Sequence, residues 1–275
     1  MKRKQFLLIL IVFSFSGLLC AQVNQAEWIW QKADGPANTW MAFRKEINLE
    51  KQPKTALAKI AVDSKYWLWI NGEMAVFEGG LKRGPNRVDT YYDEVDLAKY
   101  LKQGNNTVAL LVWYWGKGGT SHNDSKKGGL YFDASIDKIR LVSDSTWKMT
   151  VHPAYKKTTS KADMPDNRLA EWPVIFDNRD NTIENWISPD YDDSAWGNAV
   201  PKGKVPAVPW FNLVKRPIPF WKNSGLLDYV SVNKEKDKDG YIWCRLPYDA
   251  QVTPYLKVYT KTPGLTINIQ TDQYS

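Results

Sequence analysis

The sequence has little histidine and little cysteine, and this scarcity excludes several kinds of chemistry. Only 2 histidines and 2 cysteines occur among the 275 residues. His122 and His152 lie far apart, and neither has a second histidine at metal-ligand spacing. A zinc cluster and a histidine-based nucleophilic triad are therefore not expected, and both histidines are interpreted as ordinary polar residues.

Long apolar runs are also scarce, and the single one lies at the start of the chain. Three basic residues at 2–4 precede an apolar run over 6–19. This run is shorter than the roughly 20 residues that span a bilayer, but it suits a signal peptide. We expect a signal peptide over 1–21 and export to the periplasm or the medium. Cys20 leaves a lipoprotein anchor as the alternative, although no small residue stands directly before it.

The mature chain offers no disulfide, no strong charge and no phosphate-binding motif. Cys244 is its single cysteine, and the net charge of +7 includes the three basic residues of the expected signal peptide. Basic and acidic residues alternate, so nucleic-acid binding is not expected. The segment 235–240 resembles the start of a calcium loop, but Leu246 stands where a glutamate is needed. No metal site and no cofactor are predicted.

Aromatic residues and turn residues are plentiful, with 14 Trp, 14 Tyr and 15 Pro. Short segments that favour strands recur between turns, which predicts an all-β protein built as an antiparallel sandwich. One or two helical turns are expected near 96–104. The expected strands are 27–31, 40–47, 56–62, 66–70, 74–78, 107–115, 130–136, 139–142 and 148–151.

A proline-punctuated connector suggests a domain boundary. The sequence predicts a β-sandwich over 22–210, followed by the connector and the start of a second, incomplete β-sandwich over 211–275.

The stretch YWLWINGE at 66–73 places three rings beside an Asn-Gly pair, which predicts a hairpin turn. In the preceding strand, Trp67 and Trp69 share one face and Tyr66 lies on the other. Both faces are apolar, which favours core packing for these rings over a sugar platform.

Rings and polar side chains also gather at the edges of two glycine-rich loops, 79–86 and 116–129. Sugar rings stack on aromatic faces, and sugar hydroxyl groups need polar partners. Core packing is the alternative for the two tryptophans. The candidate carbohydrate-binding residues are Tyr91, Tyr92, Asp93, Trp113 and Trp115.

Eight segments, in this order, resemble the amino-terminal region of the bacterial α-L-rhamnosidases of glycoside hydrolase family 78. Each piece alone is a weak signal, and their order is the specific feature. They are WIW (28–30), FRKEI (43–47), DSKYWLWINGE (63–73), DEVDLAKYL (93–101), GNNTVALLVWYWG (104–116), Glu171 with FDNRD (176–180), DYDDSAW (190–196) and LVKRPIP (213–219).

The resemblance implies a modular exported enzyme, with jelly-roll, galactose-binding-like sandwiches before an (α/α)6 toroid that holds the acidic catalytic residues. No segment here resembles the toroid, so no residue is assigned a catalytic role. The expected partners are rhamnose-containing glycans and a catalytic domain outside this chain. Some relatives bind rhamnose through an accessory sandwich, sometimes with calcium, so the resemblance also allows a structural calcium ion.

Two other functions stay open from the sequence. The chain carries many carboxylates and could act as a hydrolase by itself, which needs two of them about a sugar. It could instead be a stand-alone carbohydrate-binding or surface-adhesion protein, which an acylated Cys20 would favour.

Overall fold

The chain divides into two compact units, residues 1–221 and 222–275, in a computed structural model. The structure describes residues 25–80, 84–119, 122–157, 171–221, 225–233, 240–247 and 255–269. The expected signal peptide, Cys20 and most of the calcium-loop-like segment lie outside these residues.

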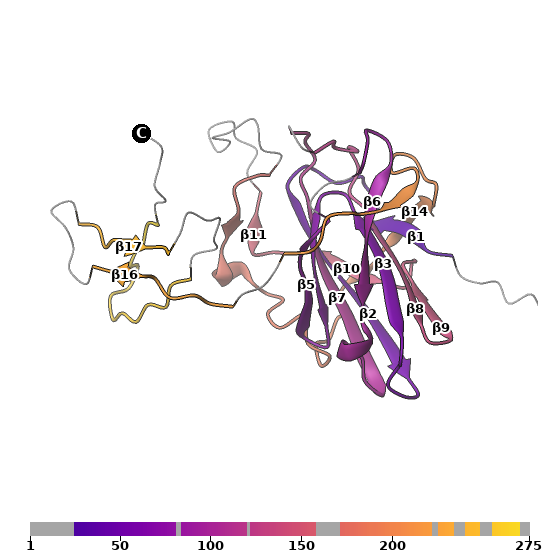
Figure 1. Ribbon diagram of the computed structural model, residues 1–275, viewed down its shortest axis with the longest axis horizontal. Coiled ribbons are helices and arrows are strands. Elements are labelled where there is room, and N and C mark those ends of the chain that lie inside the picture. The colour runs from indigo at the N-terminus through magenta and orange to yellow at the C-terminus, as the bar shows by residue number, and fades with distance from the viewer. Residues whose placement is uncertain are drawn as a thin grey trace, which may run out of the picture. The chain divides into compact units, whose positions relative to one another are not determined.

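Two β-sheets face each other in the first unit (Figure 1). Sheet A has the order β14-β1-β8-β3-β6-β15, with β9 beside β8, and sheet B has the order β13-β10-β2-β7-β4-β5. Neighbouring strands are antiparallel except β15, which runs parallel to β6. The expected antiparallel sandwich is thus confirmed. The strands of sheet A are β1 (Glu27–Trp30), β3 (Ala56–Val62), β6 (Thr90–Asp96), β8 (Leu130–Ile136), β9 (Ile139–Val142), β14 (Val200–Lys204) and β15 (Leu213–Lys215). Those of sheet B are β2 (Thr39–Leu49), β4 (Lys65–Ile70), β5 (Glu73–Gly79), β7 (Gly104–Tyr114), β10 (Lys148–Val151) and β13 (Gly197–Asn198).

The remaining elements are short. Two 3-10 turns, η1 (Ala98–Tyr100) and η3 (Asn178–Asp180), and the pair β11 (Tyr155–Lys156) and β12 (Ile175–Phe176) belong to the first unit. The second unit contains β16 (Ser231–Val232) paired with β17 (Cys244–Arg245).

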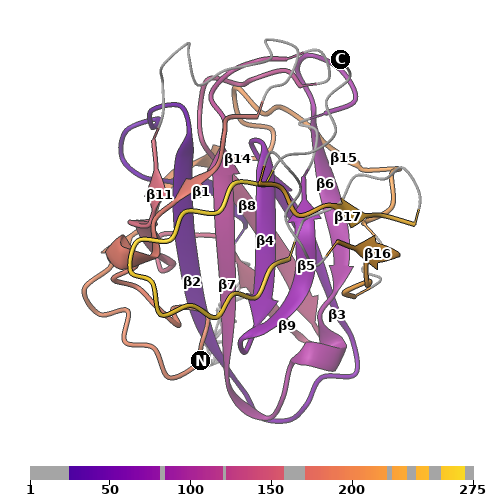
Figure 2. The same cartoon turned by 90° about the vertical axis from the view of Figure 1, so that its left-hand side faces the viewer.

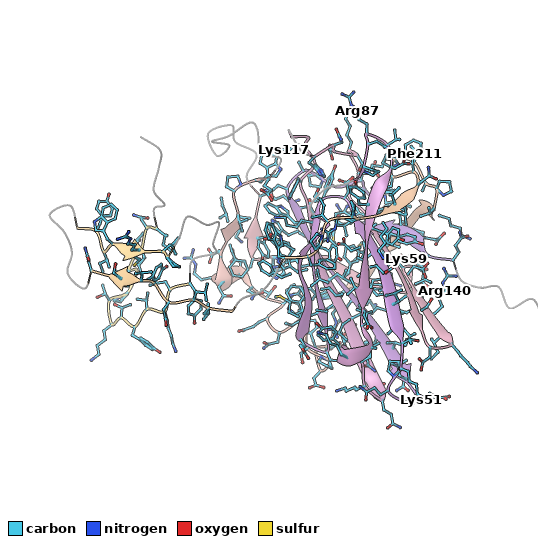
Figure 3. All side chains as sticks on the ribbon, viewed as in Figure 1. Lys51, Lys59, Arg87, Lys117, Arg140 and Phe211 are labelled. Carbon is cyan, nitrogen blue, oxygen red and sulfur yellow. The ribbon has the colours of Figure 1, made fainter. Side chains whose placement is uncertain are left out.

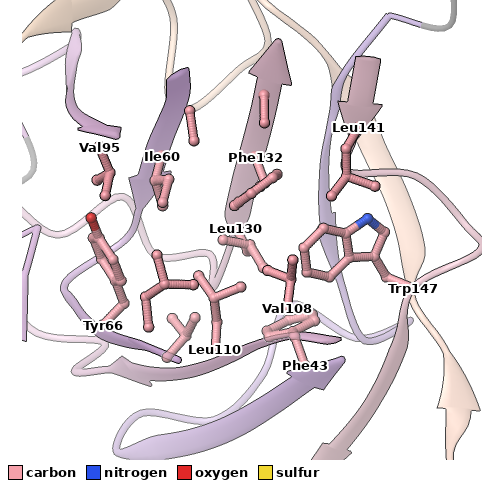
Figure 4. Close-up of a cluster of buried hydrophobic side chains, with 14 of the residues drawn as sticks. Phe43, Ile60, Tyr66, Val95, Val108, Leu110, Leu130, Phe132, Leu141 and Trp147 are labelled. Atoms are coloured by element: carbon pink, nitrogen blue, oxygen red, sulfur yellow. The ribbon is translucent and has the colours of Figure 1, made fainter. Parts of the chain in front are cut away.

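The main core lies between the two sheets (Figure 4). Sheet A contributes residues such as Ile60 and Phe132, and sheet B contributes Phe43, Leu68 and Leu110, all at most 1% exposed. These positions follow the period of two along each strand, so that one face of each sheet is turned inward.

The hairpin predicted at Asn71-Gly72 is confirmed. Both residues have positive φ, 54° and 82°, as a type I′ turn requires. The predicted alternation along β4 also holds, because Tyr66 lies in the main core while Trp67 and Trp69 lie on the outer face of sheet B.

Strand β6 and the turn after it differ from the sequence prediction. Residues 90–96 form a strand in sheet A, although they were expected to follow a loop edge. Asp96 accepts a hydrogen bond from the Ala98 N–H at 2.9 Å, as a capping residue does, but the helix is only the 3-10 turn η1. The strand escapes detection because three of its seven residues, Asp93, Glu94 and Asp96, are acids, which strands usually disfavour.

The end of the second glycine-rich loop has a packing role. A side chain at Gly128 would meet the Trp30 ring at 2.2 Å, and one at Gly129 would meet the Trp210 ring at 2.6 Å. Trp210 stacks on Trp28 with ring centres 4.4 Å apart, on the outer face of sheet A. Glycine is therefore needed here so that large rings can approach the backbone.

Candidate functional site

The outer face of sheet B carries a second cluster of aromatic side chains. Trp40, Trp113 and Trp115 are each 4% exposed. Figure 2 shows the strands of this sheet side by side, with β11 beyond β2. Residues 152–156 and 171–196, which we call the cover, supply the second layer; for example, the Tyr155 ring stacks on Trp40 with ring centres 3.9 Å apart. The aromatic residues of the chain thus fill the main core and a cluster on the outer face of each sheet.

Arg44 fastens the cover to the sheet. Its side chain is fully buried, and its Nε donates to Asp193 Oδ2 at 2.9 Å. Its Nη1 donates to the carbonyl oxygens of Trp186 and Ser188, and Nη2 donates to that of Tyr191. One guanidinium therefore binds three carbonyl groups and one carboxylate of a segment more than 140 residues away in the sequence.

The cover leaves the outer face of β4 and β5 partly open. Trp67 and Trp69 are half-buried there, and Met74, which is paired with Trp69, is 42% exposed. Phe77 is 43% exposed and follows the inward-facing Val76. We call these four residues, Trp67, Trp69, Met74 and Phe77, the β4–β5 platform. Flat rings at a partly wet surface suit stacking against the apolar face of a sugar.

An ionic group borders the platform. The Lys65 ammonium lies 2.7 Å from Glu171 Oε1 and 3.3 Å from Glu78 Oε2. Two carboxylates share one ammonium, so the group carries net negative charge and has spare acceptor oxygens. Glu78 has a left-handed backbone, φ 55°, which is uncommon outside glycine. Lys65, Glu78 and Glu171, which we call the Lys65 triad, could bind sugar hydroxyl groups.

The rim beside the triad is built from more rings and a second lysine. The Trp172 indole donates to the Trp115 carbonyl oxygen at 2.6 Å, and the Lys117 ammonium lies 4.4 Å from the Trp172 ring. Partial burial lowers the pKa of Lys117. Lys117 points away from the sandwich at the end where the glycine-rich loops lie (Figure 3).

The structure separates the five predicted carbohydrate-binding residues. Trp113 and Trp115 lie in the buried cluster on sheet B, beside the Lys65 ammonium at 6.0 and 5.8 Å. Asp93, Tyr91 and Tyr92 lie on β6 of sheet A. The role of the five in sugar binding stays a prediction, and the structure places the two tryptophans on sheet B and the other three on sheet A.

Asp93 is buried, and both of its carboxylate oxygens accept hydrogen bonds. One carboxylate oxygen accepts from the Arg216 guanidinium, and the other accepts from the Tyr66 hydroxyl and the Gly80 N–H, both at 2.9 Å. Burial, followed by the Asp93 charge, raises the pKa of Tyr66 well above its ordinary value. This carboxylate therefore links β6 to β4 through Tyr66 and to the residue after β15, Arg216.

Both histidines, which were interpreted from the sequence as ordinary polar residues, are buried. His122 Nε2 lies 3.7 Å from Asp63 Oδ1, and neither side chain has a hydrogen-bond partner among the described residues. The ring of His122 meets Trp115 edge-on at 4.7 Å. Burial raises the pKa of the nearby Asp124 carboxyl, and Asp63 adds to the rise.

Stability should fall as the pH is lowered from about 6.5 to about 4, because burial lowers the pKa of His152 from 6.5 to about 4. In this range the unfolded chain binds a proton that the folded chain does not, which costs about 1.4 kcal/mol per pH unit. Urea denaturation between pH 7 and pH 4 measures the slope. His152→Gln keeps a polar side chain without this titration, so its slope should be smaller by that amount; equal slopes would contradict the assignment.

Among the described residues, no group of three or more His, Cys, Asp or Glu side chains could hold a metal ion. No helix in the described ranges is long and apolar enough to cross a bilayer.

Sequence reasoning missed Lys65, Glu78 and Arg44. The alternation along β4 does place Lys65 on the same face as Trp67 and Trp69, and this was an available signal. Its pairing with Glu171, 106 residues away, has no local signature.

Comparisons with known proteins found relatives of this chain in sequence and in fold. No known protein-family model matches the sequence. The α-L-rhamnosidase of Formosa agariphila is 29% identical over 221 residues, which cover 76% of this chain and 22% of that protein. The chain therefore spans about a fifth of the length of this curated relative.

Two solved structures are similar to the fold. The family 78 rhamnosidase of Bacillus sp. GL1 aligns with a TM-score of 0.59 and 28% identity, covering 71% of this chain and 20% of that one. The α-L-rhamnosidase of Aspergillus terreus aligns with a TM-score of 0.59 and 18% identity, covering 80% and 25%, and it supports the fold alone. The resemblance predicted from the ordered segments is thus confirmed: this chain is similar, in sequence and in fold, to a part of the α-L-rhamnosidases of glycoside hydrolase family 78.

Proposed function

We propose that this chain is the non-catalytic β-sandwich region of an exported α-L-rhamnosidase, which supports a catalytic domain outside the chain and binds rhamnose-containing glycans. The observation that carries this proposal is the match to a rhamnosidase over 221 residues. Export is supported by the basic residues and the apolar run at the start of the sequence.

The β4–β5 platform is the surface proposed for the sugar. Half-buried rings offer a stacking face, and the Lys65 triad beside them offers an ammonium and carboxylate oxygens. Sugar-binding sites combine these two features, because apolar contact provides affinity and a few polar groups fix the orientation.

Phe77→Ala and Glu171→Gln should each weaken binding of methyl α-L-rhamnoside by about tenfold, since each removes one stacking face or one charged acceptor. Nuclear magnetic resonance titration of the purified chain measures the affinity. Phe176→Ala is the matched control, because Phe176 is 47% exposed on β12 and lies outside the platform.

Three outcomes would change the proposal. If the chain does not respond to the rhamnoside at millimolar concentration, only the scaffolding role remains. If the platform variants bind as the parent does, the sugar site lies elsewhere. Release of nitrophenol from an aryl rhamnoside by this chain would instead support a hydrolase in its own right.

The second candidate function is a stand-alone binding or adhesion protein. Cys20 in the sequence is the feature that favours it. The mass of the exported chain separates the two cases, because an acylated Cys20 adds lipid whereas cleavage after Ala21 does not.

A further inference from the structure

Part of the outer face of sheet A is open and hollowed. A groove of about 200 Å³ is lined by Leu57, Lys59, Asp133, Ser135 and Arg140. Leu57 is 45% exposed, and Lys59 and Arg140 point away from the sandwich on the same side (Figure 3). We call this the sheet A groove.

Charges of alternating sign cross the sheet at this groove. Along β3, Lys59 is in register with Glu94 of β6 and with Asp133 of β8. Each of these carboxylates already has another partner. Lys215 Nζ lies 2.6 Å from Glu94 Oε1, and Arg140 binds Asp133 through Nε at 2.8 Å and Nη2 at 2.7 Å.

Lys215 and Arg140 each pair with a carboxylate, so Lys59 is the cation of this row that can pair with a ligand. The row holds three basic and two acidic side chains, so its net charge is positive. The Lys59 ammonium lies 5.4 Å from the centre of the Tyr92 ring, and no described carboxylate lies within ion-pairing distance of it. An exposed ammonium beside a half-buried ring offers one positive charge and one flat apolar face.

These features select the chemistry of the ligand. A phosphate dianion is best bound by a free guanidinium fork, but the fork of Arg140 is occupied by Asp133. A single carboxylate needs only one ammonium. Asp133 accepts from Arg140 and, at 3.3 Å, from the Tyr131 hydroxyl, which leaves acceptor capacity on its oxygens for a sugar hydroxyl group, and Ser135 adds a hydroxyl.

We propose that the sheet A groove binds an acidic saccharide through a uronic acid residue. The carboxylate of the uronic acid pairs with Lys59, and its hydroxyl groups bind Asp133 and Ser135 in the groove. The next sugar of the chain lies against Tyr92, which stands beside the groove on β6. This surface belongs to the opposite sheet from the β4–β5 platform, so the two sites can succeed or fail independently.

The test compares trigalacturonic acid with its methyl ester, which has the same ring faces without the charge. In a titration followed by nuclear magnetic resonance, the acid should shift signals of β3, β6 and β8. The ester should bind about tenfold more weakly, the usual effect of losing one charged contact. Added salt should weaken the acid but not the ester, because salt screens exposed charges.

Lys59→Gln should remove the preference for the acid over the ester. Lys99→Gln is the matched control, since the Lys99 ammonium also lies over a tyrosine ring, 4.6 Å from that of Tyr100, outside the groove. This control should leave the preference unchanged. Equal binding of acid and ester, or an unchanged preference in Lys59→Gln, would overturn the proposal, as would absence of binding at millimolar acid. Rhamnoside binding at the platform should be the same in all of these variants.

Discussion

Replacing Arg44 with methionine should lower the free energy of unfolding by about 3–5 kcal/mol, the scale for breaking a buried ion pair by removing one partner. Methionine keeps much of the apolar volume, but it leaves Asp193 and three carbonyl groups of the cover without their donor. Urea denaturation followed by tryptophan fluorescence measures the change, and the tryptophans beneath the cover should report its loss directly.

The control for Arg44 is Arg140→Met. Arg140 also makes a two-pronged contact with a carboxylate, but its side chain is 40% exposed. Exposed ion pairs contribute only about 0.2–1 kcal/mol, so this variant should remain close to the parent in stability. If both variants lose a similar free energy of unfolding, the burial of Arg44 does not determine how much it stabilises the fold.

Replacing Asp93 with alanine should also lower the free energy of unfolding by about 3–5 kcal/mol, because it leaves the buried Arg216 guanidinium unpaired. Tyr66 and Gly80 would lose their acceptor as well. Urea denaturation measures this effect, and a double-mutant cycle with Arg216→Met measures the coupling of the pair.

Glu94→Gln is the matched control for Asp93. Glu94 is the next residue on β6, faces the other side, and pairs with Lys215, whose side chain is 58% exposed. Its loss should cost no more than about 1 kcal/mol. A stable Asp93→Ala protein that has lost affinity for a rhamnoside would contradict the structural role and return Asp93 to the predicted carbohydrate-binding residues.

The regular features of the fold follow from local pattern. Strands such as β3 and β7 have clear runs of apolar residues, and the Asn71-Gly72 turn needs only two residues to specify it. Both could be predicted because the cause and the effect lie within a few residues of each other. Strand β6 could not, because its outward positions, Tyr92, Glu94 and Asp96, look like those of a polar loop.

The contacts of the candidate site follow from tertiary structure. In FRKEI, Arg44 has the pattern of a solvent-facing strand residue, yet its side chain is fully buried, because residues 186–193 fold back over the sheet. Asp93 was expected at a loop rim, and its partner Arg216 lies 123 residues away. No periodicity of one strand can indicate a partner at that separation.

The place of β1 in sheet A has a consequence for biosynthesis. Residues 27–30 pair with 200–204, and Trp28 stacks on Trp210. On a ribosome that adds about 5–20 residues per second, β1 must wait roughly 10–40 s for its neighbour β14 to be translated. During that interval Trp28 lacks both the β14 strand and the Trp210 ring, whereas Trp30 packs on Phe43 and Tyr114, which are translated much earlier.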